Sequence, residues 1–399
     1  MKKTEQLKNA SQLFCPNEAC SARGKIGTGN LVRHGKKRER YKCKVCQKTF
    51  GIHQGTMMEG LRKPKELIVV VVTLLAYGCP VQAIVHALEL DERTVARWQE
   101  RAGAHCQNIH QDQVMQAQLD LQHVQVDEIR AKGRQMVPWM AMALMVSTRL
   151  WLGGVVSLRR DRDLANRILR LVKACCQPRK RLLVLTDGWA AYPNSIRRTF
   201  RDKLPREGTR GRCALQVWPE LVIGTVIKKT AKKRVVEIIR RMAQGTLTQA
   251  QEMLAQTRGG NELNTAFIER FNGTLRERLA SLTRRCRHAV RRVERLEAGM
   301  WLVGCTYNFC WPHHELSRRW ARTQEHKGEA SITPAMAAGL TDHVWSVQEV
   351  LTFRIAPSPW TEPTRRWPKK AKRPSCSPSS ARLRPLLRLR KGVLCSSTS

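Results

Sequence analysis

Three acidic side chains in apolar surroundings are the first candidates for chemistry. Asp127 and Asp187 each end a short apolar run that is typical of a buried strand. A carboxylate at the C-terminal end of such a strand projects into the crevice in which open α/β sheets bind ligands. Glu269 lies in a stretch whose apolar residues recur at helical spacing, on a stripe next to the apolar face. A helix packed on the sheet would therefore aim Glu269 at the sheet edge.

Such a trio supports metal-dependent chemistry. Two strand carboxylates and one helix carboxylate form a hard oxygen site for Mg²⁺ or Mn²⁺. Two such ions about 3.5–4 Å apart activate the attacking oxygen and stabilise the leaving oxygen when a phosphodiester is cleaved. Asn272 and Arg276 share the stripe of Glu269, and we expect them to contact a phosphate or DNA near the metals. Glu128 is a rival to its neighbour Asp127, but strand alternation points it to the opposite face.

A second candidate metal site is a group of cysteines near the N-terminus. Its members are Cys15, Cys20, Cys43 and Cys46. Thiolates in pairs at this spacing can meet on one tetrahedral Zn²⁺ when two knuckle turns face each other. His34 and His53 are alternative ligands, although four cysteines already complete the shell; the other interpretation is four free thiols. A segment this short has little apolar core, so bound zinc would supply its folding free energy.

The elements that must position the acids alternate in type between residues 120 and 230. Strand-like runs occur at 121–126, 139–146, 150–158, 182–185 and 221–227. A helical stretch, 164–175, separates the third run from the fourth, and this mixture predicts a layered α/β domain. Ser147, Thr148 and Arg149 interrupt the apolar stretch 136–158, which favours two strands and a turn over a membrane-spanning helix. Residues 232–352 are expected to be mostly helical.

Upstream of these strands the pattern predicts three short helices. Pro64 is well suited to the start of the first, Gly78-Cys79-Pro80 forms a break, and Asp91 is a good N-cap for the third. Two short helices joined by a tight turn, with basic residues on the outer face of the last, form the layout of a DNA-reading helix-turn-helix. The side chains expected to contact DNA are Arg93, Thr94 and Arg97. A plain all-helical module is the alternative.

The net charge of the chain indicates which class of molecule it binds. The chain has 399 residues and a formal net charge of +40, from 72 Lys+Arg against 32 Asp+Glu. A field of that sign attracts polyanions, which argues against an ordinary small-molecule enzyme and favours nucleic acid. Two basic runs, 228–234 and 284–295, are candidates for tracking phosphates, with a solvated surface as the alternative. The N-terminus is polar and has no pattern of a secretory signal, so the cysteines are not expected to form a disulfide scaffold. Both points favour a cytoplasmic protein over a membrane protein.

The expected organisation is multidomain. It comprises a zinc-ribbon DNA-binding module at 1–60, a helix-turn-helix module at 61–104, a linker at 105–119, an α/β catalytic domain at 120–352 and a disordered basic tail at 353–399. The tail is rich in Pro, Ser and Arg, a composition that cannot bury enough apolar surface to fold.

Taken together, the motifs resemble those of DDE transposases of bacterial insertion sequences, specifically the group typified by insertion sequence one. The similar segments are Cys15–Cys20, Tyr41–Phe50, Val126–Glu128, Leu185–Trp189, Asn264–Asn272 and Thr333–Leu340. The resemblance implies an RNase H-like catalytic domain, with Asp127, Asp187 and Glu269 as its acids. It also implies N-terminal modules that recognise terminal inverted repeats. Many relatives divide the DNA-binding and catalytic parts between two reading frames, whereas this chain is continuous.

The resulting hypothesis is a transposase that cleaves one strand at each end of an insertion sequence and joins the freed 3′-OH to target DNA. It would use structural Zn²⁺ and catalytic Mg²⁺ or Mn²⁺, bind double-stranded repeat and target DNA as a homo-oligomer, and associate with the nucleoid of a bacterial or archaeal cell. Two alternatives stay open. One is a DNA-binding regulator derived from an inactive transposase, and the other is a nuclease without strand transfer.

Overall fold

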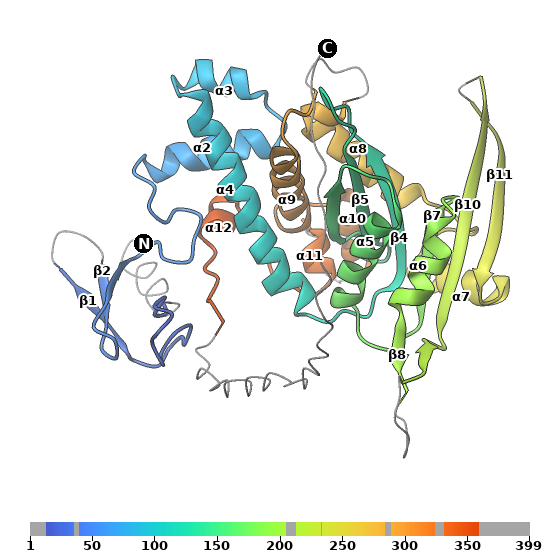
Figure 1. The fold of residues 1–399 in the computed structure, drawn as a ribbon, viewed down its shortest axis with the longest axis horizontal. Helices are drawn as coiled ribbons and strands as arrows, with labels where there is room; N and C mark the ends of the chain where they lie inside the picture. Colours follow the sequence, from blue (N-terminus) through green and yellow to red (C-terminus); the bar gives the residue numbers. More distant parts are fainter. Residues whose placement is uncertain are drawn as a thin grey trace, which may run out of the picture. The chain divides into compact units, whose positions relative to one another are not determined.

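The structure is a computed structural model that describes residues 13–35, 40–204, 213–232, 234–283, 289–323 and 331–358. The tail from residue 359 onward, expected to be disordered, lies outside the described residues. The protein is an α/β molecule built on a mixed six-stranded sheet, with a small three-stranded sheet near its N-terminus (Figure 1).

The N-terminal sheet is held around its cysteines. Its strands are β1 (Leu31–His34), β2 (Arg40–Cys43) and β3 (Thr49–Gly51), and they pair antiparallel in that order. The buried cluster inside the sheet consists of Cys15, Cys20, Ala22 and Cys43. So few apolar groups supply little burial free energy, and small domains of this kind rely on a metal or disulfides for stability.

Three helices follow, as the sequence predicts. They are α2 (Lys65–Ala76), α3 (Val81–Ala87) and α4 (Glu92–His110). Pro64 and Pro80 precede the first two, where the missing N–H costs nothing. The Asp91 carboxylate caps α4 by accepting hydrogen bonds from the backbone N–H groups of Arg93 and Thr94. The helices predicted from the pattern are therefore confirmed.

The expected linker at 105–119 is not an open connection. Helix α4 continues to His110 and is followed by a short π-helical turn, Gln111–Met115. Cys106, Ile109 and Val114 are fully buried in the main hydrophobic core. The glutamines give this segment a polar composition, but its apolar residues still recur at helical spacing. The boundary expected at residue 104 therefore falls inside a helix.

The main sheet has the strand order β11-β10-β7-β4-β5-β6. Its strands are β4 (Gln122–Arg130), β5 (Trp139–Met145), β6 (Trp151–Ser157), β7 (Leu182–Asp187), β10 (Leu221–Ala231) and β11 (Arg234–Gln244). Strands β4, β5 and β6 form an antiparallel meander, while β7 runs parallel to both β4 and β10. The two strands expected within 136–158 are thus β5 and β6.

One expectation about this sheet was wrong. Residues 232–352 were expected to be mostly helical, but 234–244 form β11, the antiparallel partner of β10. Val235, Val236, Ile238 and Ile239 lie in this segment, and β-branched residues favour an extended chain. The resulting long hairpin stands at one edge of the sheet (Figure 1).

Helices cover both faces of the sheet, and alternate residues of β4 show which face is which. His123, Gln125 and Asp127 bond to residues 257–272, on α7 (Leu247–Thr257), α8 (Ala266–Arg278) and the loop between them. Glu128 bonds instead to α6 (Ala191–Thr199), which packs beside α5 (Arg162–Cys175). Strands β8 (Arg201–Lys203) and β9 (Leu215–Val217) pair antiparallel in a small separate ribbon.

The remaining helices complete the core. They are η2 (Ala280–Leu282), α9 (Val293–Phe309), α10 (His314–Thr323), α11 (Pro334–Ala337) and α12 (Val347–Thr352). After α12 the chain docks on the N-terminal segment, where the Ile355 N–H donates to the Gly55 carbonyl at 3.1 Å. Residues 353–355 therefore belong to the folded body. None of the helices in the described ranges is long and apolar enough to span a bilayer.

Candidate active site and cysteine cluster

Asp127 and Asp187 meet at one end of the sheet because their strands are parallel neighbours. The ladder between β4 and β7 pairs Val126 with Thr186, one residue before each aspartate. One carboxylate oxygen from each of Asp127, Glu128 and Asp187 lies within 4.8 Å of the others. Oxygen ligands at that separation suit a hard divalent cation. The structure therefore brings together the two predicted aspartates and adds Glu128 to them.

Glu128 reaches this group from the opposite face of the sheet. Its side chain is only 1% exposed and accepts hydrogen bonds from the Tyr192 hydroxyl and the Arg160 guanidinium. Alternation does place it on the α6 face, as expected, but this does not remove it from the site. Strand β7 ends at Asp187, so side chains from both faces can converge beyond that end.

Arg160 is a site residue that the sequence argument missed. Its guanidinium binds Glu128 at 2.9 Å and Asp187 at 3.1 Å, and it lies over the rings of Trp139 and Trp189. Guanidinium groups stack on aromatic faces and bond two carboxylates at once. Arg160 follows β6 in an arginine-rich turn, and no spacing signal in the sequence distinguishes it from its neighbours.

Glu269 stands beside this group on the first turn of α8. Its Oε1 accepts hydrogen bonds from Lys228 Nζ and Thr265 Oγ1, both at 2.5 Å. Glu269 and Asp187 line the same open hollow, together with Trp189 and Lys228. The third predicted acid is therefore close to the aspartates, while a lysine from β10 neutralises it.

The position of α8 is fixed by Gln125, which lies two residues before Asp127 on the same face of β4. Gln125 Oε1 accepts hydrogen bonds from the N–H groups of Phe267 and Ile268, each at 3.0 Å, and its Nε2 donates to the Asn264 carbonyl at 2.8 Å. Helix N-termini leave such N–H groups without partners inside the helix. A buried glutamine of the strand thus caps the helix that carries Glu269.

Asn272 and Arg276 occupy different environments on α8. Asn272 is 1% exposed, and its Nδ2 donates to Asp127 Oδ2 at 2.8 Å. This hydrogen bond makes Asn272 a residue that orients Asp127, and its expected contact with a phosphate stays a prediction. Arg276 lies about two turns beyond Glu269 and is half-buried.

The acids are crowded enough to alter their ionisation. Burial, followed by the charge of Asp187, raises the pKa of Asp127 to about 6, and Glu269 contributes in the same direction. Burial also raises the pKa of Glu128 to about 7, although the Tyr192 and Arg160 hydrogen bonds oppose the shift. Like charges and low local dielectric both disfavour the ionised forms. A divalent cation would relieve this repulsion.

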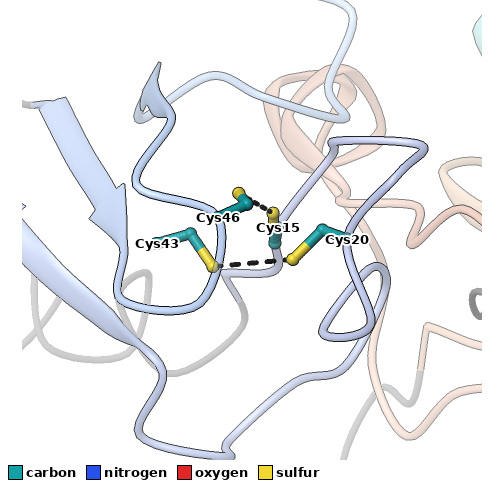
Figure 2. A group of neighbouring side chains, drawn as sticks. All are labelled: Cys15, Cys20, Cys43 and Cys46. Carbon is teal, nitrogen blue, oxygen red and sulfur yellow. Dashed lines mark hydrogen bonds between the residues drawn. The ribbon is translucent and has the colours of Figure 1, made fainter.

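The four N-terminal cysteines form a compact cluster (Figure 2). The Sγ atoms of Cys15 and Cys46 are 3.6 Å apart, those of Cys20 and Cys43 are 3.9 Å apart, and all four lie within 4.8 Å of one another. Zn–S bonds of about 2.3 Å in a tetrahedron place sulfur atoms roughly 3.8 Å apart, whereas a disulfide needs about 2.05 Å. The cluster could therefore hold a zinc ion.

The surroundings of these thiols also suit a metal. Burial raises the pKa of Cys15, while in Cys46 hydrogen bonds from the Lys48 backbone and Asn17 outweigh burial and lower the pKa to about 7. Asn30 Nδ2 donates to Cys43 Sγ at 3.8 Å, a contact typical of the groups around a metal ligand. His34 is on β1 and exposed, and neither it nor His53 belongs to the cluster.

The predicted DNA-reading residues lie at the start of α4. Arg93 and Arg97 are exposed and Thr94 is partly exposed, while Val95 and Trp98 are buried. The first turns of α4 therefore present a basic face to solvent.

Comparison of the sequence with known protein families finds no match, and a search of curated proteins finds no similar sequence.

Proposed function

We propose that this chain is a DDE transposase that binds the terminal inverted repeats of an insertion sequence and catalyses DNA strand cleavage and strand transfer. The observation that carries the proposal is the convergence of Asp127 and Asp187 from parallel strands with Glu269 from α8. Acids from separate elements, gathered in a strongly basic protein, suit a reaction on a polyanion that needs cations between protein and substrate.

The sheet topology supports an RNase H-like catalytic domain. An RNase H-like sheet has an antiparallel meander of three strands followed by two parallel strands on the side of the first. Strands β6-β5-β4-β7-β10 have that order and those directions. Strand β11 extends this core, and α8 crosses the face from which Asp127 projects.

The residues at the site would divide the work as follows. Asp127, Glu128 and Asp187, with Glu269 beside them, would supply oxygen ligands for Mg²⁺ or Mn²⁺, which would activate the attacking oxygen and stabilise the leaving one. Asn272 orients Asp127, and Thr265 orients Glu269. Arg160 and Lys228 are placed to neutralise Asp187 and Glu269, or to bind a phosphate once cations replace them.

The N-terminal elements supply DNA binding in this proposal. A zinc ion on the four cysteines would stabilise the small sheet, and Arg93, Thr94 and Arg97 would contact the repeat. Cleavage at two ends and joining to a target require more than one copy on the DNA, so we propose a homo-oligomer.

The test is a cleavage and joining assay with labelled DNA from the flanks of the gene. Wild-type protein with Mg²⁺ or Mn²⁺ should nick and join this DNA, whereas Asp187→Asn and Glu269→Gln should lose about a hundred- to a thousand-fold in rate. Glu262→Gln is the matched control, because the Glu262 side chain is 66% exposed and pairs with Arg240 away from the three acids. Normal cleavage by Asp187→Asn would refute the assignment.

The same assay separates the alternatives. Tight binding without cutting indicates a DNA-binding regulator, and cutting without joined products indicates a nuclease.

A further inference from the structure

A second hollow, of about 930 Å³, lies at the far end of α8 from Glu269. One side is formed by residues 78–82, between α2 and the start of α3, together with Glu92 and Gln99 of α4. The other side is formed by the C-terminal end of α8 and by residues 289–296. Residues 284–288, in one of the basic runs, lie outside the described residues.

The hollow is lined by arginines from separate parts of the chain. They are Arg134, Arg278, Arg291, Arg292 and Arg295. Glu92 is the one acidic residue among its described lining residues, and nearby Glu100 pairs with Arg292 and Arg295. Within the described ranges, no carboxylate pairs with Arg134 or Arg291. The described lining of the hollow therefore carries excess positive charge.

Arg278 holds the two sides together. Its guanidinium donates to the Tyr77 carbonyl at 2.9 Å and lies over the rings of Tyr77 and Trp311. Gly78 has a positive φ of 83°, and a Cβ there would lie 3.0 Å from the Arg278 Cα atom. The backbone of the α2–α3 turn thus packs directly on the end of α8. Arg278 is therefore held by contacts from both sides of the hollow, whereas Arg134, Arg291 and Arg292 are exposed on its walls.

Helix α8 links this surface to the acidic site. Arg278 comes two and a half turns after Glu269. At 1.5 Å per residue, this segment of the helix is about 14 Å long. That length corresponds to roughly four steps of a B-form strand. We propose that the arginine hollow binds backbone phosphates of the DNA duplex whose cleaved phosphate lies at Asp127, Asp187 and Glu269. This inference rests on the proposed function and adds a second contact point on the same strand.

The apolar residues of the lining form the buried base of the hollow. Leu279, Val290 and Leu296 lie there, each at most 7% exposed. The arginines around this base are therefore the groups that can contact a sugar–phosphate backbone. Contacts of this kind position DNA without reading its sequence.

The test compares DNA binding by Arg134→Ala/Arg291→Ala and by wild-type protein over a range of salt concentrations. Two probes are used: a duplex from the flanks of the gene and a scrambled duplex of the same composition. We expect the double variant to bind both probes about ten-fold or more weakly and to lower the salt slope by about 2, one for each lost phosphate contact. Arg134→Lys/Arg291→Lys should keep most of the slope.

Arg198→Ala is the matched control, because Arg198 is an exposed helical arginine far from the hollow in sequence, on α6. It should leave the salt slope unchanged. Thermal unfolding of each variant checks that it is folded. A double variant that is folded and has the wild-type slope would overturn the inference, even if wild-type protein cleaves DNA. Wild-type protein that binds neither duplex would overturn the proposed function and this inference together.

Discussion

At the scale of single residues, every acid at the site already has a protein partner. Arg160 holds Glu128 and Asp187, Lys228 holds Glu269, and Asn272 holds Asp127. These contacts allow several carboxylates to lie close together without a metal. They also mean that a bound cation would compete with Arg160 for the oxygens of Asp187.

The ionisation of Asp127 and Glu128 gives a prediction about metal binding. Their pKa values in the folded protein, about 6 and about 7, exceed the ordinary 3.8 and 4.5, so the folded state holds protons that the unfolded chain releases. In the presence of a chelator, these protons stabilise the folded state at low pH. The stabilisation is lost as the pH rises through the pKa values of the folded protein.

Mn²⁺ binds the deprotonated carboxylates, so it should raise the melting temperature more at about pH 8 than at about pH 5. The measurement is thermal unfolding with Mn²⁺ and with chelator at both pH values. Asp127→Asn should reduce the pH-dependent part of the Mn²⁺ effect. An equal Mn²⁺ effect at both pH values would count against a carboxylate site with raised pKa values.

At the scale of elements, helix α8 carries groups for two tasks. Its first turn holds Glu269, its middle holds Asn272 against Asp127, and its last turn holds Arg278 against Tyr77. A shift of this helix would therefore disturb the acidic site and the arginine hollow together. Gln125 is the contact that fixes its N-terminal end.

Gln125→Leu should therefore destabilise the protein and impair catalysis. The substitution leaves the N–H groups of Phe267 and Ile268 and the Asn264 carbonyl without their partner, and the expected cost is about 1–3 kcal/mol. Urea unfolding measures this cost against Gln107→Leu, a change at an exposed glutamine of α4. Equal unfolding free energies in the two variants would show that Gln125 does not hold α8.

The elements also show what the sequence could and could not reveal. Asp127 and Asp187 were predictable, because each ends an apolar run and parallel strand ends lie at one edge of a sheet. Strand alternation alone directs Glu128 to the opposite face from Asp127, and only the end of β7 at Asp187 shows that the two carboxylates can still meet. The partnership of Arg160 with two acids depends on a tertiary contact that no local pattern contains. Strand β11 was missed because its charged residues hid the β-branched ones.

At the scale of the whole molecule, the expected helix-turn-helix module and the expected α/β domain share one hydrophobic core, while the N-terminal cysteines form a separate cluster. Residues of α2, α3 and α4 belong to the same buried cluster as the main sheet and α9. Helix α4 packs on α9, and at Gly103 an added Cβ would lie 2.4 Å from the Ala298 carbonyl oxygen. The helices expected to read DNA are thus packed into the same core as the main sheet.

The close approach of α4 and α9 predicts opposite effects on the unfolding free energy for two glycine substitutions, one at this contact and one on α8. Gly103→Ala should lower the unfolding free energy by on the order of 1–3 kcal/mol, because the Ala298 backbone cannot yield cheaply. Gly273→Ala on α8 meets nothing within 4 Å and should raise it by up to about 1 kcal/mol through helix propensity. Chemical denaturation measures both. Stabilisation by Gly103→Ala would mean that α4 and α9 do not approach this closely.

The close contact at Gly103 has a consequence for how the chain must be synthesised. A ribosome that stopped at residue 104 would release the three N-terminal helices before α9 had been made. The face of α4 that carries Gly103 would then lack the backbone of α9 on which it packs in the full chain. A product that ended there would lack the packing of Gly103 against Ala298, through which α4 is joined to the rest of the core in the full chain.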